Sequence, residues 1–120
     1  MSPDDLIRLR HMAEAARLAI GFAQGRERAD LECDAMLRLA VLHAVQIVGE
    51  AATRVSEAGR AAVPGIEWPA VVGMRNRLVH AYFDVNTDIL WDTLQLGLPE
   101  LLERMGAVGE LAGDTPDAGR

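Results

Sequence analysis

Lysine is absent from this sequence, so every side chain that stays cationic at neutral pH is an arginine. A phosphate-binding loop of the Gly-x-x-x-x-Gly-Lys type is therefore excluded. The sequence also lacks the Gly-x-Ser-x-Gly motif that places a serine nucleophile on a strand-to-helix turn. These absences argue against P-loop nucleotide hydrolases and serine hydrolases.

Cysteine is nearly absent, because Cys33 is the sole example. It cannot form an internal disulfide, which fits a reducing compartment, and we expect it to be a small core residue on a helix. The three histidines, His11, His43 and His80, form no pair with metal-ligand spacing. The sequence therefore predicts neither a metal site nor a bound cofactor.

Long apolar runs and excess positive charge are missing too. We find no run that approaches the roughly 20 apolar residues of a membrane span, and the first five residues lack the basic start of a signal peptide. We therefore expect a cytoplasmic protein without a membrane partner. The net charge of −6 argues against broad, nonspecific nucleic-acid binding. A nucleic-acid site would have to be local or assembled from two chains.

What the sequence has in abundance is helix-forming residues. Alanine and leucine dominate, and 120 residues suffice for one domain. We predict an all-α, up-down four-helix bundle in residues 1–111 and a flexible tail in 112–120. No segment has the pattern of a strand. The predicted helices are 3–24, 31–57, 69 to 82 or 83, and 88–109.

Local signals place the ends and faces of these helices. Ser2 and Asp30 are the expected caps of the first and second helices, and Pro99 should kink or break the fourth. The second helix is apolar over much of its circumference, which is typical of a bundle centre or an interface. We therefore expect a homodimer. His43, on that helix, should be a core residue, and His11 should lie at the surface or its boundary.

The chemistry is concentrated in one segment without acidic residues, which carries Arg75, Asn76, Arg77, His80 and Tyr82. Such side chains suit a phosphate ester, because histidine moves protons near neutral pH and arginine binds phosphate. On a continuous helix Arg75 and His80 would point about 140° apart. The arginine could bend, the helix could end between them, or a second chain could supply the partner group.

The same residues also have an ordinary interpretation. Taken by position alone, Arg75 and Arg77 would be solvated helix residues, His80 a helix end cap and Tyr82 an amphipathic tyrosine at a helix end. The spacing of arginine and histidine does not by itself distinguish the two interpretations.

A family resemblance does distinguish them. Arg75, His80 and Tyr82 match the R-x4-H-x-Y pattern of the HepT-like toxins, which belong to the HEPN superfamily of small helical ribonucleases. The chain resembles that family from about residue 4 to residue 108. The similar segments are residues 47–52, 64–68, 73–76, 80–85, 89–91 and 98–102.

The resemblance implies a metal-independent endoribonuclease that acts as a dimer, with the two R-x4-H segments facing each other. The RNA 2′-hydroxyl would attack the adjacent phosphate, which makes RNA and not DNA the substrate. His80 would move protons, Arg75 would stabilise the phosphate, and Asn76 and Arg77 would support RNA binding. The family also implies an MntA-like nucleotidyltransferase antitoxin that transfers AMP to Tyr82 and so silences the toxin.

Two other functions stay open. The chain could be a noncatalytic helical subunit that docks a minimal nucleotidyltransferase, since a nucleotide site also uses arginine and histidine. It could also be a structural dimerisation bundle. An adjacent gene for a nucleotidyltransferase, and growth arrest on expression, would separate the three.

Overall fold

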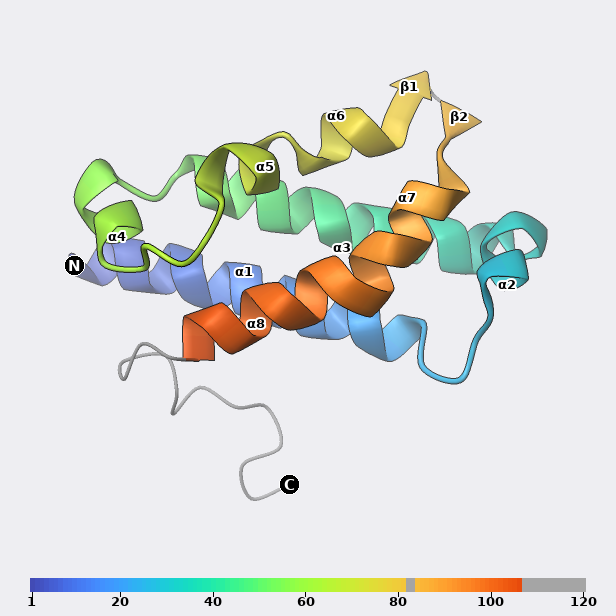
Figure 1. The fold of residues 1–120 in the computed structure, drawn as a ribbon, viewed down its shortest axis with the longest axis horizontal. Coiled ribbons are helices and arrows are strands. Elements are labelled where there is room, and N and C mark those ends of the chain that lie inside the picture. Colours follow the sequence, from blue (N-terminus) through green and yellow to red (C-terminus); the bar gives the residue numbers. More distant parts are fainter. Residues whose placement is uncertain (82–83, 107–120) are drawn as a thin grey trace.

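The computed structural model describes residues 1–81 and 84–106, and this part of the protein is almost entirely helical (Figure 1). Two long helices, α1 (Pro3–Phe22) and α3 (Ala35–Thr53), lie side by side and antiparallel. The predicted all-α class is confirmed. The bundle is less regular than four continuous helices, because every predicted helix after the first is divided. The predicted tail lies outside the described residues.

α1 begins and ends close to the predicted positions. Ser2 caps it as expected, since the backbone N–H of Asp5 donates to Ser2 Oγ at 3.1 Å. After Phe22 the chain turns through Gly25, whose φ of +74° is a conformation that glycine adopts readily. Small and aliphatic side chains fill the buried side of α1, namely Leu9, Met12, Ala13, Ala15, Ala16 and Ala19.

The prediction of one continuous second helix is wrong. α2 (Arg28–Cys33) stops at Asp34, whose backbone is extended with φ −110° and ψ 98°, and α3 begins at the next residue. Asp34 caps α3 in place of Asp30, because the N–H of Leu37 donates to its carboxylate at 3.1 Å. That hydrogen bond also holds the pKa of Asp34 below its ordinary value. An aspartate that bonds the backbone nearby competes with continuous helix, which accounts for the break.

α3 also ends earlier than predicted, and a short helix α4 (Glu57–Ala61) follows it. Ser56 caps α4, since the N–H of Gly59 donates to Ser56 Oγ at 3.1 Å. Ser56 Oγ in turn donates to the buried carboxylate of Asp5 at 2.5 Å, and the N–H of Ser56 donates to the same carboxylate at 2.9 Å. The start of α1 is thereby fixed to the start of α4.

Two short helices, α5 (Trp68–Val72) and α6 (Met74–Leu78), replace the predicted third helix. They meet at Gly73, and both pack on α3. The buried indole of Trp68 anchors α5, because its N–H donates to the carbonyls of Arg60 and Val63 at 3.2 and 3.3 Å. The long helix pair therefore carries the segment in which the predicted chemistry lies.

The chain leaves the helical conformation after Leu78. β1 (Val79–Ala81) pairs antiparallel with β2 (Asp84–Val85), so the prediction that a helix continues to residues 82–83 is wrong, and so is the absence of strands. β1 begins with a β-branched valine, which favours extended backbone. The carbonyl of Leu78 accepts from the N–H of Asn86 at 2.8 Å, a partner that a continued helix would not provide.

The predicted fourth helix is divided into α7 (Thr87–Asp92), the π-helical turn η1 (Thr93–Gly97) and α8 (Leu98–Gly106). The break that Pro99 was expected to cause lies in the turn just before it, where the N–H of Leu98 donates to Thr93. A widened turn relieves the clash of a proline ring with the preceding turn. Leu96, within this turn, faces solvent and is 68% exposed.

The prediction that no apolar run approaches a membrane span in length needs correction at α3. Its 19 residues would suffice, by length and composition alone, to cross a membrane. In this fold its buried side packs against α1, α2, α5 and α6. Burial of residues such as Val41, Val45 and Val48 accounts for the apolar composition of that side.

Candidate functional site

The segment predicted to be catalytic changes conformation in its middle. Arg75, Asn76 and Arg77 are exposed on α6, whereas His80 is the central residue of β1. The helix therefore ends between Arg75 and His80, which is one of the geometries that the sequence left open. The angular offset expected on a continuous helix does not apply here. Tyr82, the predicted AMP acceptor, lies outside the described residues.

Arg75 and Asn76 open onto a shallow pocket of about 270 Å³ between α6 and α3. α3 contributes most of the remaining wall, and Val72 completes it; the α3 residues are Gln46, Gly49, Glu50 and Thr53. The pocket thus presents a guanidinium, two amides, a hydroxyl and one carboxylate. Hydrogen-bond donors of this kind can hold the oxygens of a phosphate ester.

Gly49 allows α3 and α5 to come close enough to form this pocket. A Cβ at this position would stand 3.4 Å from the carbonyl oxygen of Val71 and 3.6 Å from that of Val72. A larger side chain would have to displace the end of α5, to which α6 is joined. Gly49 thus permits the close approach of α3 and α5, and that approach sets where Arg75 lies.

Arg75 has its guanidinium available for a ligand. Its side chain forms no hydrogen bond or ion pair with any residue in 1–81 and 84–106. Other arginines are engaged: Arg28, for example, pairs with Asp88 at 3.0 Å. On a chain of net charge −6, an exposed arginine without a carboxylate partner is the kind of group that binds an external anion.

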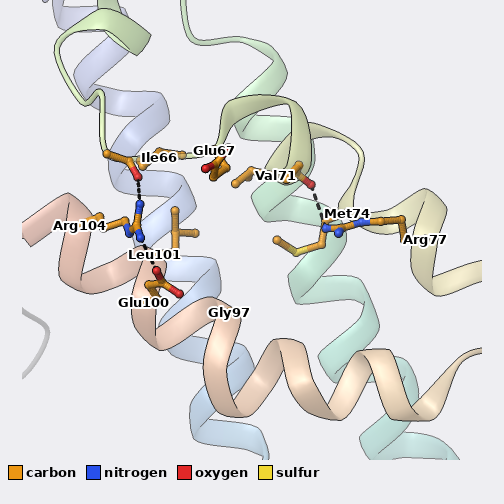
Figure 2. A pocket seen from close by; sticks show the side chains of 11 residues that line it. Ile66, Glu67, Val71, Met74, Arg77, Gly97, Glu100, Leu101 and Arg104 are labelled. Atoms are coloured by element: carbon orange, nitrogen blue, oxygen red, sulfur yellow. Dashed lines mark hydrogen bonds and ion pairs between the residues drawn. The ribbon is translucent and has the colours of Figure 1, made fainter.

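Arg77, predicted to support RNA binding beside Arg75, belongs to a different pocket. Its guanidinium donates to the carbonyl of Ala70 at 3.1 Å and borders a hollow of about 280 Å³ between α5, α6 and α8. Figure 2 shows Arg77 and Arg104 at opposite ends of this hollow, with Arg104 paired to Glu100. The structure therefore brings Arg75 and Asn76 together and separates Arg77 from them.

Gln46 and Glu50 were missed in the sequence reading, although they face Arg75 and Asn76 across the pocket. The available signal was their spacing. Residues four apart on a helix share a face, and both flank Gly49, the residue of closest approach. The sequence could not show that α6 would lie on this face of α3.

Two single-residue predictions need correction. His43 is exposed and not a core residue, because it lies on the outer side of α3. Cys33 is also exposed, at the end of the short helix α2. His11 is exposed on α1, as predicted. Within the described ranges, no three histidine, cysteine or acidic side chains gather into a metal-binding group.

Comparison with known proteins identifies one family. The family model described as "Ribonuclease HepT-like" matches residues 12–108. A protein of Thermococcus cleftensis named as a probable ribonuclease HepT is 34% identical over 93 residues, which cover 78% of this chain and 84% of that protein.

A second relative, from Caldanaerobacter subterraneus, has a name that gives RNase as its expected activity. It is 31% identical, and the match covers 78% of this chain and 83% of that protein. No solved structure matches. The comparisons confirm both the resemblance drawn from the residues and the predicted ribonuclease class.

Proposed function

Because this chain belongs to the ribonuclease HepT-like family, we propose that it is a cytoplasmic, metal-independent endoribonuclease and the toxin of a toxin–antitoxin pair. The observation that supports the proposal most directly is the availability of the Arg75 side chain for a ligand. It is exposed, it has no partner among the described residues, and it precedes His80 by five positions within the region that matches the family.

The proposed reaction is attack by a 2′-hydroxyl oxygen of RNA on the neighbouring phosphorus. The new O–P bond forms while the bond to the 5′-oxygen breaks, and a 2′,3′-cyclic phosphate and a 5′-hydroxyl result. His80 moves the proton between these oxygens. Arg75 binds the equatorial phosphate oxygens, whose charge increases in the transition state. Asn76, beside Arg75 in the pocket, is placed to donate a further hydrogen bond.

We further propose that the active form is a homodimer held through the outer side of α3. Met36 and Leu39 on that side are 84% and 54% exposed. With His43, Gln46 and Glu50 they follow the alternating three- and four-residue spacing of a helix–helix seam. A second copy would cover the apolar end of this stripe, and its polar end borders the Arg75 pocket.

Regulation by a nucleotidyltransferase partner is the third part of the proposal. Tyr82 follows His80 by two residues in the sequence. Transfer of AMP from ATP to its hydroxyl releases pyrophosphate and leaves a phosphodiester. Each added phosphate brings about one negative charge close to a site that must bind phosphate, so RNA is repelled.

The test is RNA cleavage by the purified chain with a chelator present. The native protein should cut, and His80→Ala should lose roughly 10²- to 10⁴-fold in rate while its helical circular dichroism is unchanged. Arg75→Ala should lose a similar factor. Arg17→Ala removes the same charge from α1 and is the matched control. Near-native cleavage by His80→Ala would show that the mechanism is wrong.

A native chain that does not cut RNA, but binds the nucleotidyltransferase, would favour a noncatalytic docking subunit instead. Arg77→Ala tests which pocket binds the RNA, because Arg77 is on the same helix as Arg75 but faces the hollow between α5, α6 and α8. We expect its loss of rate to be smaller than that of Arg75→Ala. Equal losses would mean that both pockets meet the RNA.

A further inference from the structure

A second pocket, lined by basic side chains, lies on the other flank of α3. It has a volume of about 220 Å³, lies between α1 and α3, and its polar wall is formed by Arg8, His11, Glu50 and Arg54. Arg8 and His11 are three residues apart on α1, and therefore share a face. No sequence pattern groups Arg8 with Arg54, because 45 intervening residues separate them.

The basic groups of this pocket have no acidic partner in the described part of the chain. Among residues 1–81 and 84–106, the side chains of Arg8, His11 and Arg54 form no hydrogen bond or ion pair. Arg26, by contrast, contacts Asp34 at 2.6 Å. Two guanidinium groups around one hollow, with a single carboxylate beside them, favour an anionic ligand that has more than one oxygen to offer.

Glu50 joins this pocket to the proposed active site, because it lines both. The residues that α3 and its C-cap, Arg54, contribute to the two pockets are interleaved. One flank has Gln46, Gly49, Glu50 and Thr53, and the other has Ile47, Glu50, Ala51 and Arg54. The two pockets therefore lie at the same level of the helix. They are separated by about the width of a helix, ~10 Å.

We propose that Arg8, His11 and Arg54 form a second phosphate site, which binds an RNA phosphate next to the one being cleaved. The inference rests on the proposed ribonuclease function and extends it. A single strand would cross α3 from flank to flank, with its scissile phosphate at Arg75 and a flanking phosphate at Arg8 and Arg54. The carboxylate of Glu50, on the ridge, repels phosphate there and so favours positions on either side.

Binding to a short 2′-O-methyl RNA oligonucleotide tests the site without cleavage, because this RNA lacks the attacking hydroxyl. The double variant Arg8→Gln, Arg54→Gln should bind on the order of tenfold more weakly than the native chain. Its log–log salt slope should fall by about 0.7 for each lost phosphate contact. Arg17→Gln is the matched control: it is nine residues from Arg8 on α1, which places it on the opposite side of the helix.

Cleavage of two substrates separates this site from the active site. With an RNA oligonucleotide, the double variant should show a raised KM and a kcat within about twofold of native. With a dinucleotide, which contains only the scissile phosphate, native and variant should cleave equally. Equal binding and equal KM on the longer RNA would overturn the second site while the ribonuclease function stands.

Failure of the native chain to cleave either RNA would overturn the ribonuclease function. The binding measurement would then still decide the second site on its own. Weaker binding only in the double variant would support a phosphate site in a noncatalytic RNA-binding protein. Equal binding by native chain, double variant and Arg17→Gln would leave no role for Arg8 and Arg54 in holding RNA.

Discussion

The α1–α3 pair and the segment from Trp68 to Val85 are built in opposite ways. α1 and α3 keep one conformation for 20 and 19 residues, and their facing sides are filled with alanine and valine. The other segment changes conformation repeatedly, through two five-residue helices and a short strand pair. Helices of five residues do not persist alone in water. The segment from Trp68 to Val85, hereafter the chemical segment, therefore depends on the long pair for its shape. Four variants test the two regions and the contact between them.

The largest effect should come from Tyr82→Phe, which acts on the chemical segment alone. Incubation with ATP and the proposed nucleotidyltransferase partner should add AMP to the native chain and none to the variant, as measured by mass spectrometry. The variant should keep its fold and should resist neutralisation, because it lacks only the acceptor oxygen. Equal modification of the two chains would place the switch on another residue.

Leu39→Glu tests whether the outer side of the long pair controls the chemical segment. A charge in a buried interface is strongly unfavourable, so light scattering should shift from a dimer to a monomer mass near 13 kDa. RNA cleavage should be lost with the dimer. Leu96→Glu is the matched control, because Leu96 is also an exposed leucine but lies on η1 and not on α3. A native chain that is already monomeric at micromolar concentration would contradict the dimer.

Gly49→Val tests the contact between the two regions. The added carbons meet the carbonyl oxygens of Val71 and Val72, so the end of α5 must move and α6 with it. Displacement of about 1 Å at a catalytic group can cost up to 10²-fold, and we expect a cleavage loss of roughly tenfold or more with only moderate loss of stability. Gly21→Val is the control, since nothing lies within 4 Å of a Cβ there.

Asp5→Asn tests the link between α1 and α4, away from the chemical segment, and should have the smallest effect on function. Hydrogen bonds from Ser56 hold the pKa of Asp5 below its ordinary value. Because the folded pKa is depressed, this carboxylate stabilises the fold above its unfolded pKa, and the contribution is lost as the pH falls through the folded pKa. The melting temperature of the native chain should exceed that of the variant at neutral pH. This difference in melting temperature should disappear as the pH falls below about 4.

Asp4→Asn is the control for that measurement. It removes one carboxylate from the same turn, and Asp4 is exposed and bonded to none of the described residues. If the difference in melting temperature between the native chain and Asp5→Asn did not depend on pH, the geometry of the Asp5 side chain, and not its charge, would link α1 to α4. Cleavage at neutral pH should be unchanged in both variants.

Parts of the fold and site could be read from the sequence because their causes are local. The Ser2 cap acts over three residues, and the buried side of α1 follows the helical period. Asp34 is the counterexample. It has the same capping chemistry as Asp30, which lies only four residues away. The sequence-based prediction named Asp30 as the cap, whereas Asp34 caps α3. Both aspartates have the same propensity to cap a helix, and the packing of the surrounding chain determines which of them caps α3.

The sequence by itself determined the helical class, the family and the residues that carry chemistry, because these depend on composition, period and a short motif. Only the tertiary structure decided that α6 ends before His80, since the carbonyl of Leu78 finds the N–H of Asn86. It also decided that Arg75 and Arg77, two residues apart, face different pockets. Both outcomes depend on partners distant in sequence, and no local pattern encodes which distant segment a residue will meet.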